Sequence, residues 1–331
     1  VLDYLEFAIV NDDVRWRSAG IRVAVTFLHI PEIVRWLRSI GFVSAIMIIT
    51  LPVDGLDDAG AKQQLRECQL LAAQVVCILA EIPEFMADLV RPPVLIFLTT
   101  CLTDDSLQAV PEAHDLATST LRKLSTPQNI AILDDNSVDY ILCSFIRSAD
   151  LDRPNPTERD YMFKLKKWQS RVSAVSNGAS VLSEFVKQGF HIPLEGGILV
   201  SMLVNMLRKS GNLHLYVSIV KCLYYMFKTN PDTVKLARAC STDGTSNTLN
   251  RYLADLWNGP GSEWHAMLKT DSPSDDFLTD EVGRPLSKAA VAEKFDLVKE
   301  LVCYVSGLFL FFTPMQCNDI ACTRLCNFYK R

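Results

Sequence analysis

Basic side chains recur along this 331-residue sequence at the spacing of a single helix face. Residues three, four or seven positions apart lie on the same side of an α-helix, so the charges of each group would be presented together. Arginine and lysine suit carboxylate partners, and a neighbouring Trp or Tyr adds anchoring area. The candidate partner-binding residues are Arg15, Arg22, Lys62, Arg66, Lys164, Lys167, Trp168, Arg171, Lys221, Tyr225 and Lys228.

Other interpretations of these basic residues stay open. Charged side chains on helices most often only solvate an exposed face. Nucleic acid would also fit a basic groove, but the formal net charge is −5 and no dense basic run occurs, so we expect a protein partner. No apolar run approaches the roughly 18 residues of a membrane span, and we expect no membrane partner.

The ten cysteines are scattered, most of them within apolar segments, as in proteins of a reducing compartment. We therefore expect a cytoplasmic or nuclear location. Cys317, Cys322 and Cys326 lie close together, but no fourth zinc ligand is near them. We interpret them as structural thiols, with a metal or redox role as the alternative.

Motifs that carry enzyme chemistry are absent from the sequence. The five histidines share no motif, and no Gly-rich phosphate loop, GxSxG or HExxH occurs. We expect no enzyme, no cofactor and no metal, although an active site assembled from distant residues remains a third hypothesis. The stretch 258–286, rich in Gly, Pro, Ser and Asp, is either a regulatory loop or a tolerated surface insertion.

The elements that would position these residues are all predicted to be helices. Apolar residues recur with a helical period along almost the whole chain, and no alternating run is followed by a hairpin signal. We predict helices at 1–10, 14–29, 42–50, 59–81, 94–102, 110–124, 137–148, 160–176, 181–189, 197–209, 214–228, 247–257, 287–312 and 318–329, with an interruption at 177–179.

A proline-marked junction between helices recurs along the chain. In the first instance a helix ends near His29, Pro31 opens a short helix, Gly41 ends it and an apolar helix follows. Similar junctions occur at Pro83, Pro127, Pro231 and, in weaker form, Pro314, with the phrase 174–180 filling a longer interval. The first two intervals are 52 and 44 residues, close to the repeat of two or three helices in armadillo and HEAT arrays.

The order of a long helix, a Pro step, a short helix, a Gly and an aliphatic helix resembles armadillo repeats more than HEAT repeats. The resemblance implies an all-α, right-handed α-solenoid of about six armadillo-like repeats, whose third helices line a concave groove. We expect a single repeat domain over residues 1–331, with mobile connections at 149–159 and 258–286. Because the chain begins with Val, we also expect it to be a fragment of a longer protein.

The same resemblance suggests a function. It implies a non-catalytic scaffold or adaptor that binds an acidic or amphipathic segment of a partner in the groove. The alternative is an armadillo-type regulator of a small GTPase or another enzyme, which would grasp a folded domain. Armadillo proteins that bind extended peptides carry an Asn about six residues before the Pro step. Here those positions hold Val25, Cys77, Leu121, Tyr225 and Leu308, and only Asn177 resembles such an Asn.

Overall fold

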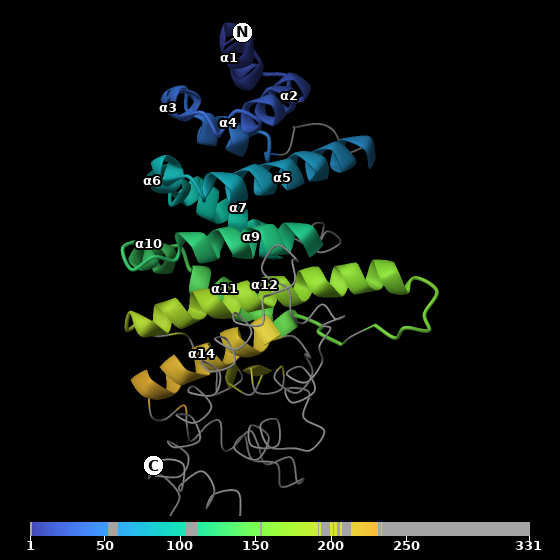
Figure 1. Ribbon diagram of the computed structural model, residues 1–331, viewed down its shortest axis with the longest axis vertical. Helices are drawn as coiled ribbons and strands as arrows, with labels where there is room; N and C mark the ends of the chain where they lie inside the picture. Colours follow the sequence, from blue (N-terminus) through green and yellow to red (C-terminus); the bar gives the residue numbers. More distant parts are fainter. Residues whose placement is uncertain are drawn as a thin grey trace, which may run out of the picture. The chain divides into compact units, whose positions relative to one another are not determined.

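The computed structural model of the chain is helical, with connecting turns and loops, wherever it is described (Figure 1). It describes residues 2–51, 59–103, 111–152 and 154–190, and beyond these only 192, 199–200, 202–203, 206, 213–230 and 233. No strand occurs among these residues, so the all-α prediction is confirmed for them. The predicted helices at 247–257, 287–312 and 318–329, the stretch 258–286, and the Pro231 and Pro314 junctions lie outside the described residues.

The chain divides into two compact units, which are described separately. Unit 1 comprises Val1–Asp150 and Pro154–Glu184, and unit 2 comprises Leu151–Arg153 and Phe185–Arg331. The single domain over residues 1–331 stays a prediction. The helices are α1 (Leu2–Val10), α2 (Val14–Val25), α3 (Pro31–Ser39), α4 (Phe42–Ile48), α5 (Ala59–Leu79), the 3₁₀ turn η1 (Pro83–Phe85), α6 (Met86–Leu89), α7 (Pro92–Thr103), α9 (Pro111–Leu124), α10 (Ile130–Asp135), α11 (Val138–Ser148), α12 (Tyr161–Lys187) and α14 (Leu213–Thr229).

The first proline junction has the predicted geometry. Asp13 caps α2 by accepting a 2.7 Å hydrogen bond from the backbone N–H of Arg15. Pro31 is the first residue of α3, a position where its missing N–H costs no helical hydrogen bond. Gly41 then takes a φ of 75°, which reverses the chain so that α4 begins directly after it. A long helix, a short helix and an apolar helix therefore form one unit of the repeat.

The next two repeats follow the same order with local differences. Pro83 opens the turn η1, which continues into α6, and α7 begins at Pro92. Pro127 lies in a turn, and α10 begins three residues later at Ile130. Figure 1 shows the long helices α2, α5 and α9 in succession in unit 1, with the short helices α3, α6 and α10 gathered at one end of them.

The core of unit 1 joins consecutive repeats. Helix α5 packs against α9, α7 packs against both α9 and α11, and α3 and α4 contact η1 and α5 respectively. Phe42 and Phe85, which belong to successive repeats, are both fully buried, and their ring centroids are 6.5 Å apart. Because each repeat buries its apolar face against its neighbours, the array is stabilised chiefly by contacts between adjacent repeats.

One sequence prediction about helix boundaries is wrong. The predicted interruption at 177–179 does not occur, because α12 runs without a break from Tyr161 to Lys187. A Cβ built on Gly178 would come 3.4 Å from Ile146 Cδ1 and 3.5 Å from Leu142 Cδ2. Both are ordinary van der Waals distances, so α12 packs against α11 at this point, and one glycine costs a helix only about 1 kcal/mol. The phrase 174–180 is therefore part of a long helix and not a junction.

A backbone strain distinguishes the third repeat from the first. Ser137 precedes α11 as Gly41 precedes α4, and it has a φ of 56°, which costs an L-residue roughly 1–2 kcal/mol. Ser137→Gly should raise the free energy of unfolding by about 1 kcal/mol, and Gly41→Ala should lower it by about as much. Urea unfolding would measure both. As a control, Ser144→Gly within α11 should lower the free energy of unfolding by about 0.5 kcal/mol. A Ser137→Gly protein that is no more stable than the parent would show that the backbone at Ser137 is not strained.

Candidate functional site

The predicted partner-binding residues of unit 1 lie on the long helices α2, α5 and α12. Helix α2 contacts α5, and the Ser18 hydroxyl of α2 lies 3.6 Å from the Sγ of Cys68 on α5. Two pairs of cations therefore lie on neighbouring helices. Five of the predicted residues of unit 1 are exposed: Arg15, Arg22, Lys62, Arg66 and Lys164.

The remaining predicted residues on α12 are less accessible. Lys167 and Arg171 are half-buried and lie near His114 of α9, whose pKa both of them lower. Trp168 has only 6% of its surface exposed. Its aromatic ring is therefore packed in the interior of unit 1, and it does not supply the anchoring area that the sequence suggested.

Three lysines on the long helices have carboxylate partners within unit 1. Lys164 pairs with Glu158, and the hydrogen bond between them raises the pKa of the lysine and lowers that of the glutamate. Lys166 Nζ lies 2.8 Å from Glu112 Oε1 on α9, which raises the lysine pKa. Lys123 Nζ lies 2.8 Å from Glu81 Oε1 and donates to the Cys77 carbonyl at 3.1 Å, so it ties α9 to the end of α5.

A buried polar seam lies between α9 and α12. His114 is 5% exposed, and its Nε2 has no hydrogen-bond partner. Burial, with smaller contributions from Arg171 and then Lys167, lowers its pKa from 6.5 to about 4. The adjacent Asp115 accepts a hydrogen bond from Ser173, but burial outweighs this bond and raises the aspartate pKa. The imidazole is thus neutral at pH 7 and is held in the interior without a partner for Nε2.

Asn177 takes part in the same seam. It is 8% exposed, and its Nδ2 donates to Asp115 Oδ1 at 3.3 Å. An Asn that binds the backbone of an extended peptide must present its amide to the groove. The one residue that resembles such an Asn is instead engaged with a neighbouring helix, so it adds no binding site for extended peptides.

In unit 2 the predicted residues lie on α14. Tyr225 is half-buried, and its ring centroid is 5.0 Å from that of Tyr224 in an edge-on arrangement. Lys228 is exposed, and its Nζ lies 5.8 Å from the centroid of the Tyr224 ring, a distance suited to a cation–π contact. Lys221 is half-buried on the same helix.

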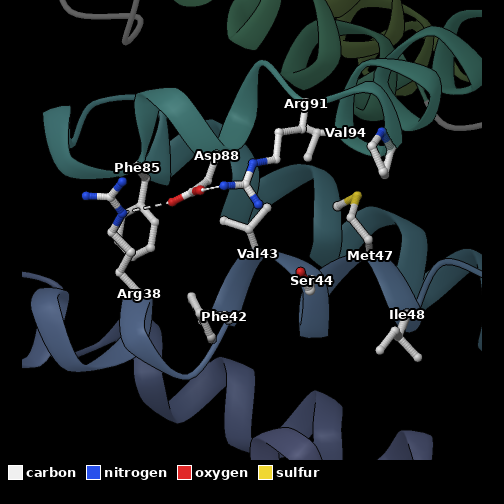
Figure 2. Close-up of a pocket in the computed structure, with 12 residues that line it drawn as sticks. Arg38, Phe42, Val43, Ser44, Met47, Ile48, Phe85, Asp88, Arg91 and Val94 are labelled. Atoms are coloured by element: carbon white, nitrogen blue, oxygen red, sulfur yellow. Dashed lines mark hydrogen bonds and ion pairs between the residues drawn. The ribbon is translucent and has the colours of Figure 1, made fainter.

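A pocket that the sequence did not indicate lies elsewhere in unit 1 (Figure 2). It has a volume of about 430 Å³ and is lined by α3 and α4 of one repeat and by η1, α6 and the start of α7 of the next. Its apolar walls are formed by Phe42, Val43, Met47, Ile48, Phe85 and Val94.

Two arginines and one aspartate form the charged part of this pocket. Asp88 Oδ2 accepts from Arg38 Nε at 3.0 Å, and its Oδ1 lies 2.7 Å from Arg91 Nη2, as Figure 2 shows. The Asp88 side chain is only 14% exposed, whereas those of Arg38 and Arg91 are 47% and 65% exposed. The cluster carries one net positive charge, and both guanidinium groups reach solvent.

The sequence did contain a signal for this cluster, in the short helices that follow the proline junctions. Arg38 lies seven residues after Pro31, and Asp88 lies five residues after Pro83. Both belong to the short helix that follows a junction, and the short helices of consecutive repeats come together in unit 1. Comparison of charges on successive short helices would therefore have pointed to the Arg38–Asp88 pair.

The described residues contain no group of three or more His, Cys, Asp or Glu side chains that could hold a metal ion. The cysteine cluster at 317, 322 and 326 lies outside them. Among the helices that the structure describes, no single one has the length and apolar character of a membrane span. Lys62–Leu79 with Pro83–Leu89 meets those criteria only as a pair, and the pair is bent by 113°.

Comparison with solved structures identifies the fold. No protein-family model matches the sequence, and no curated protein matches it. A designed armadillo repeat protein matches the structure with a TM-score of 0.52 and 14% identity, over 91% of this chain and 100% of the other. The crystal structure of an engineered protein matches with a TM-score of 0.51 and 13% identity, over 91% and 96%. The chain therefore has an armadillo-like helical repeat fold.

Proposed function

We propose that this chain, with its armadillo-like repeat fold, is a non-catalytic scaffold that binds an acidic or amphipathic segment of a partner protein. The repeats would form a right-handed solenoid of about six units in a single domain, and the segment would lie along the third helices. Repeat arrays of this kind expose long surfaces on which successive repeats each contribute a few side chains.

The observation that carries the proposal is the row of exposed cations on α2 and α5 in an acidic chain. Arg15 and Arg22 lie two helical turns apart on α2, and Lys62 and Arg66 lie one turn apart on α5. The whole chain has a formal charge of −5, so this concentration of positive charge differs from its general composition. We call these four residues the basic face.

The chemistry of the basic face favours carboxylates. An arginine presents several N–H donors in one plane and can bind a carboxylate with two parallel hydrogen bonds. Because the side chains are exposed, each contact would contribute modestly and would weaken as salt is added. Affinity would therefore depend on several contacts along the segment. Lys167 and Arg171 would add positive charge at α12. In unit 2, Lys221 and Lys228 would add positive charge and Tyr225 would add anchoring area.

The proposal is tested by reversing charges on the basic face. We expect the triple variant Arg15→Glu, Arg22→Glu and Arg66→Glu to bind an acidic partner segment at least tenfold more weakly, a change of about 1.4 kcal/mol. The substituted side chains are exposed, so the fold should be retained. Partners would be captured from lysate by parent and variant, identified by mass spectrometry, and remeasured as purified segments by calorimetry.

A matched control reverses three exposed arginines outside the basic face, namely Arg35, Arg147 and Arg159. This control has the same net charge as the triple variant, so it separates the position of the charge from its amount. Equal loss of every captured partner in both variants would contradict the basic face. Capture of a small GTPase in one nucleotide state only would favour the regulator of a folded domain instead.

The location in the cell is part of the same proposal. Cys68, Cys101 and Cys222 are buried and behave as small apolar side chains in the core. Such use of cysteine suits the cytoplasm or the nucleus, where thiols are kept reduced. Fractionation of cells that produce the tagged chain would test this, and recovery from a secretory compartment would contradict it.

A further inference from the structure

We propose that the pocket between α3–α4 and η1–α7 is a second binding site, which takes a partner segment containing a carboxylate side chain close to a large aliphatic one. The site is separate from the basic face. It uses short helices and the apolar helices α4 and α7, none of which contributes to that face. The inference therefore stands whether or not the basic face binds a partner.

The charges of the pocket call for a carboxylate. Asp88 neutralises one of the two guanidinium groups that it contacts, which leaves one positive charge in the cluster. Arg38 donates a hydrogen bond to Asp88 through its Nε, and Arg91 forms its ion pair with Asp88 through its Nη2. An arginine has five N–H donors, so each guanidinium keeps donors for a second carboxylate. Since Asp88 holds both side chains in place, a ligand would lose less entropy in ordering them.

The apolar walls call for an aliphatic side chain beside that carboxylate. Ile48 has 46% of its surface exposed, and Met47, on the same helix, is half-buried. Val43, Ser44, Met47 and Ile48 line the same pocket as Arg91 (Figure 2), so the charged and apolar parts belong to one pocket. A volume of about 430 Å³ lies within the range of about 300–1,000 Å³ that is usual for binding pockets.

The rigidity of the pocket follows from the repeat. Phe42 and Phe85 are fully buried and line it from the two adjoining repeats. Gly41 directs the chain into α4 on one side, and Pro92 begins α7 on the other. The walls are therefore built on packed helices, which favours a preformed site for one segment.

The probes are short fluorescein-labelled peptides of Ser and Gly that contain one Glu and one Leu, from adjacent to a few residues apart. We expect one spacing to bind the full chain saturably, as measured by fluorescence anisotropy. Arg91→Gln should weaken that binding about tenfold, and replacing the peptide Glu by Gln should have a similar effect. Ile48→Ser should weaken it about threefold. Both protein substitutions lie at exposed positions, and circular dichroism would verify that the variants are folded.

A second measurement locates the peptide. With methionine methyl groups labelled by ¹³C, the Met47 resonance, assigned by Met47→Leu, should shift as the peptide saturates the chain. The triple variant of the basic face should bind the probe as the parent does. Failure of every spacing to bind, unchanged affinity in folded Arg91→Gln, or an unmoved Met47 resonance would overturn the proposal. Loss of peptide binding in the triple variant would also overturn the proposal, because the peptide would then bind the basic face.

Discussion

Acidification from pH 7 to about 4 should lower the free energy of unfolding of unit 1 by about 3 kcal/mol through His114 alone. In the folded state its pKa is lowered to about 4, whereas an unfolded histidine titrates near 6.5. Between these values the unfolded chain binds a proton that the folded chain does not. The stabilisation is therefore complete above about pH 6.5 and is lost as the pH falls towards 4.

The variant His114→Leu should remove this contribution. At pH 7.5 its stability should be within about 1 kcal/mol of the parent, because the loss of the ring contact with Phe145 is offset by removal of the unpartnered Nε2. At pH 4.5 the variant should be the more stable protein. Urea unfolding at a series of pH values would measure the difference between the two curves.

Neighbouring groups make the comparison with the parent essential. Burial raises the pKa values of Asp115 and Asp139, so their contributions to stability increase as the pH falls and oppose that of His114. The difference between parent and His114→Leu cancels most of these contributions. His29→Gln, at an exposed position, is the control for replacement of a histidine outside the seam. A His114→Leu profile parallel to that of the parent would show that His114 is not buried in its neutral form.

The largest single loss of stability is expected for Phe85→Ala, at roughly 3–5 kcal/mol. Phe85 is fully buried, and its ring lies against Phe42 of the preceding repeat, so truncation leaves a cavity at the joint between two repeats. Phe85→Leu keeps much of the volume and should cost less than half as much. Urea unfolding followed by circular dichroism would give both values.

Two further variants distinguish the effect of the Phe42–Phe85 contact on stability from that of a general loss of apolar surface. Ile96→Ala on α7 removes a side chain that is 60% exposed and should change stability by less than about 1 kcal/mol. The double variant with Phe42→Ala should lose less than the sum of the single variants, with a coupling of about 0.5–1.5 kcal/mol. Strict additivity would mean that the two rings do not stabilise the joint together.

Local sequence patterns predicted most of the helices and the junctions between them. Pro31 and Gly41 act through their own backbone geometry, since proline lacks an N–H and glycine accepts a positive φ. The predicted helix at 110–124 agrees with α9, and that at 214–228 agrees with α14 to within one residue at each end. Such features depend on residues close in sequence, and they can therefore be inferred from one sequence.

The prediction was less successful where a residue depends on a distant partner. Gly178 looks like a helix breaker in the sequence, yet α12 continues through it, where the helix packs beside Leu142 and Ile146 of α11. The pocket was missed because Arg38 and Asp88 are 50 positions apart in the sequence and come into contact only when two short helices pack together. For the basic residues the sequence predicted a shared helix face but not which members remain exposed.

The sequence by itself determined that this protein is a helical repeat, because proline, glycine and helical periodicity act within a few residues. Tertiary structure alone decided that Trp168 and His114 enter the interior, that Asn177 binds Asp115, and that two arginines and Asp88 meet beside an apolar pocket. The physical reason is that burial and pairing depend on how neighbouring helices stack. Side chains many residues apart in the sequence are then buried together and form ion pairs and hydrogen bonds with one another.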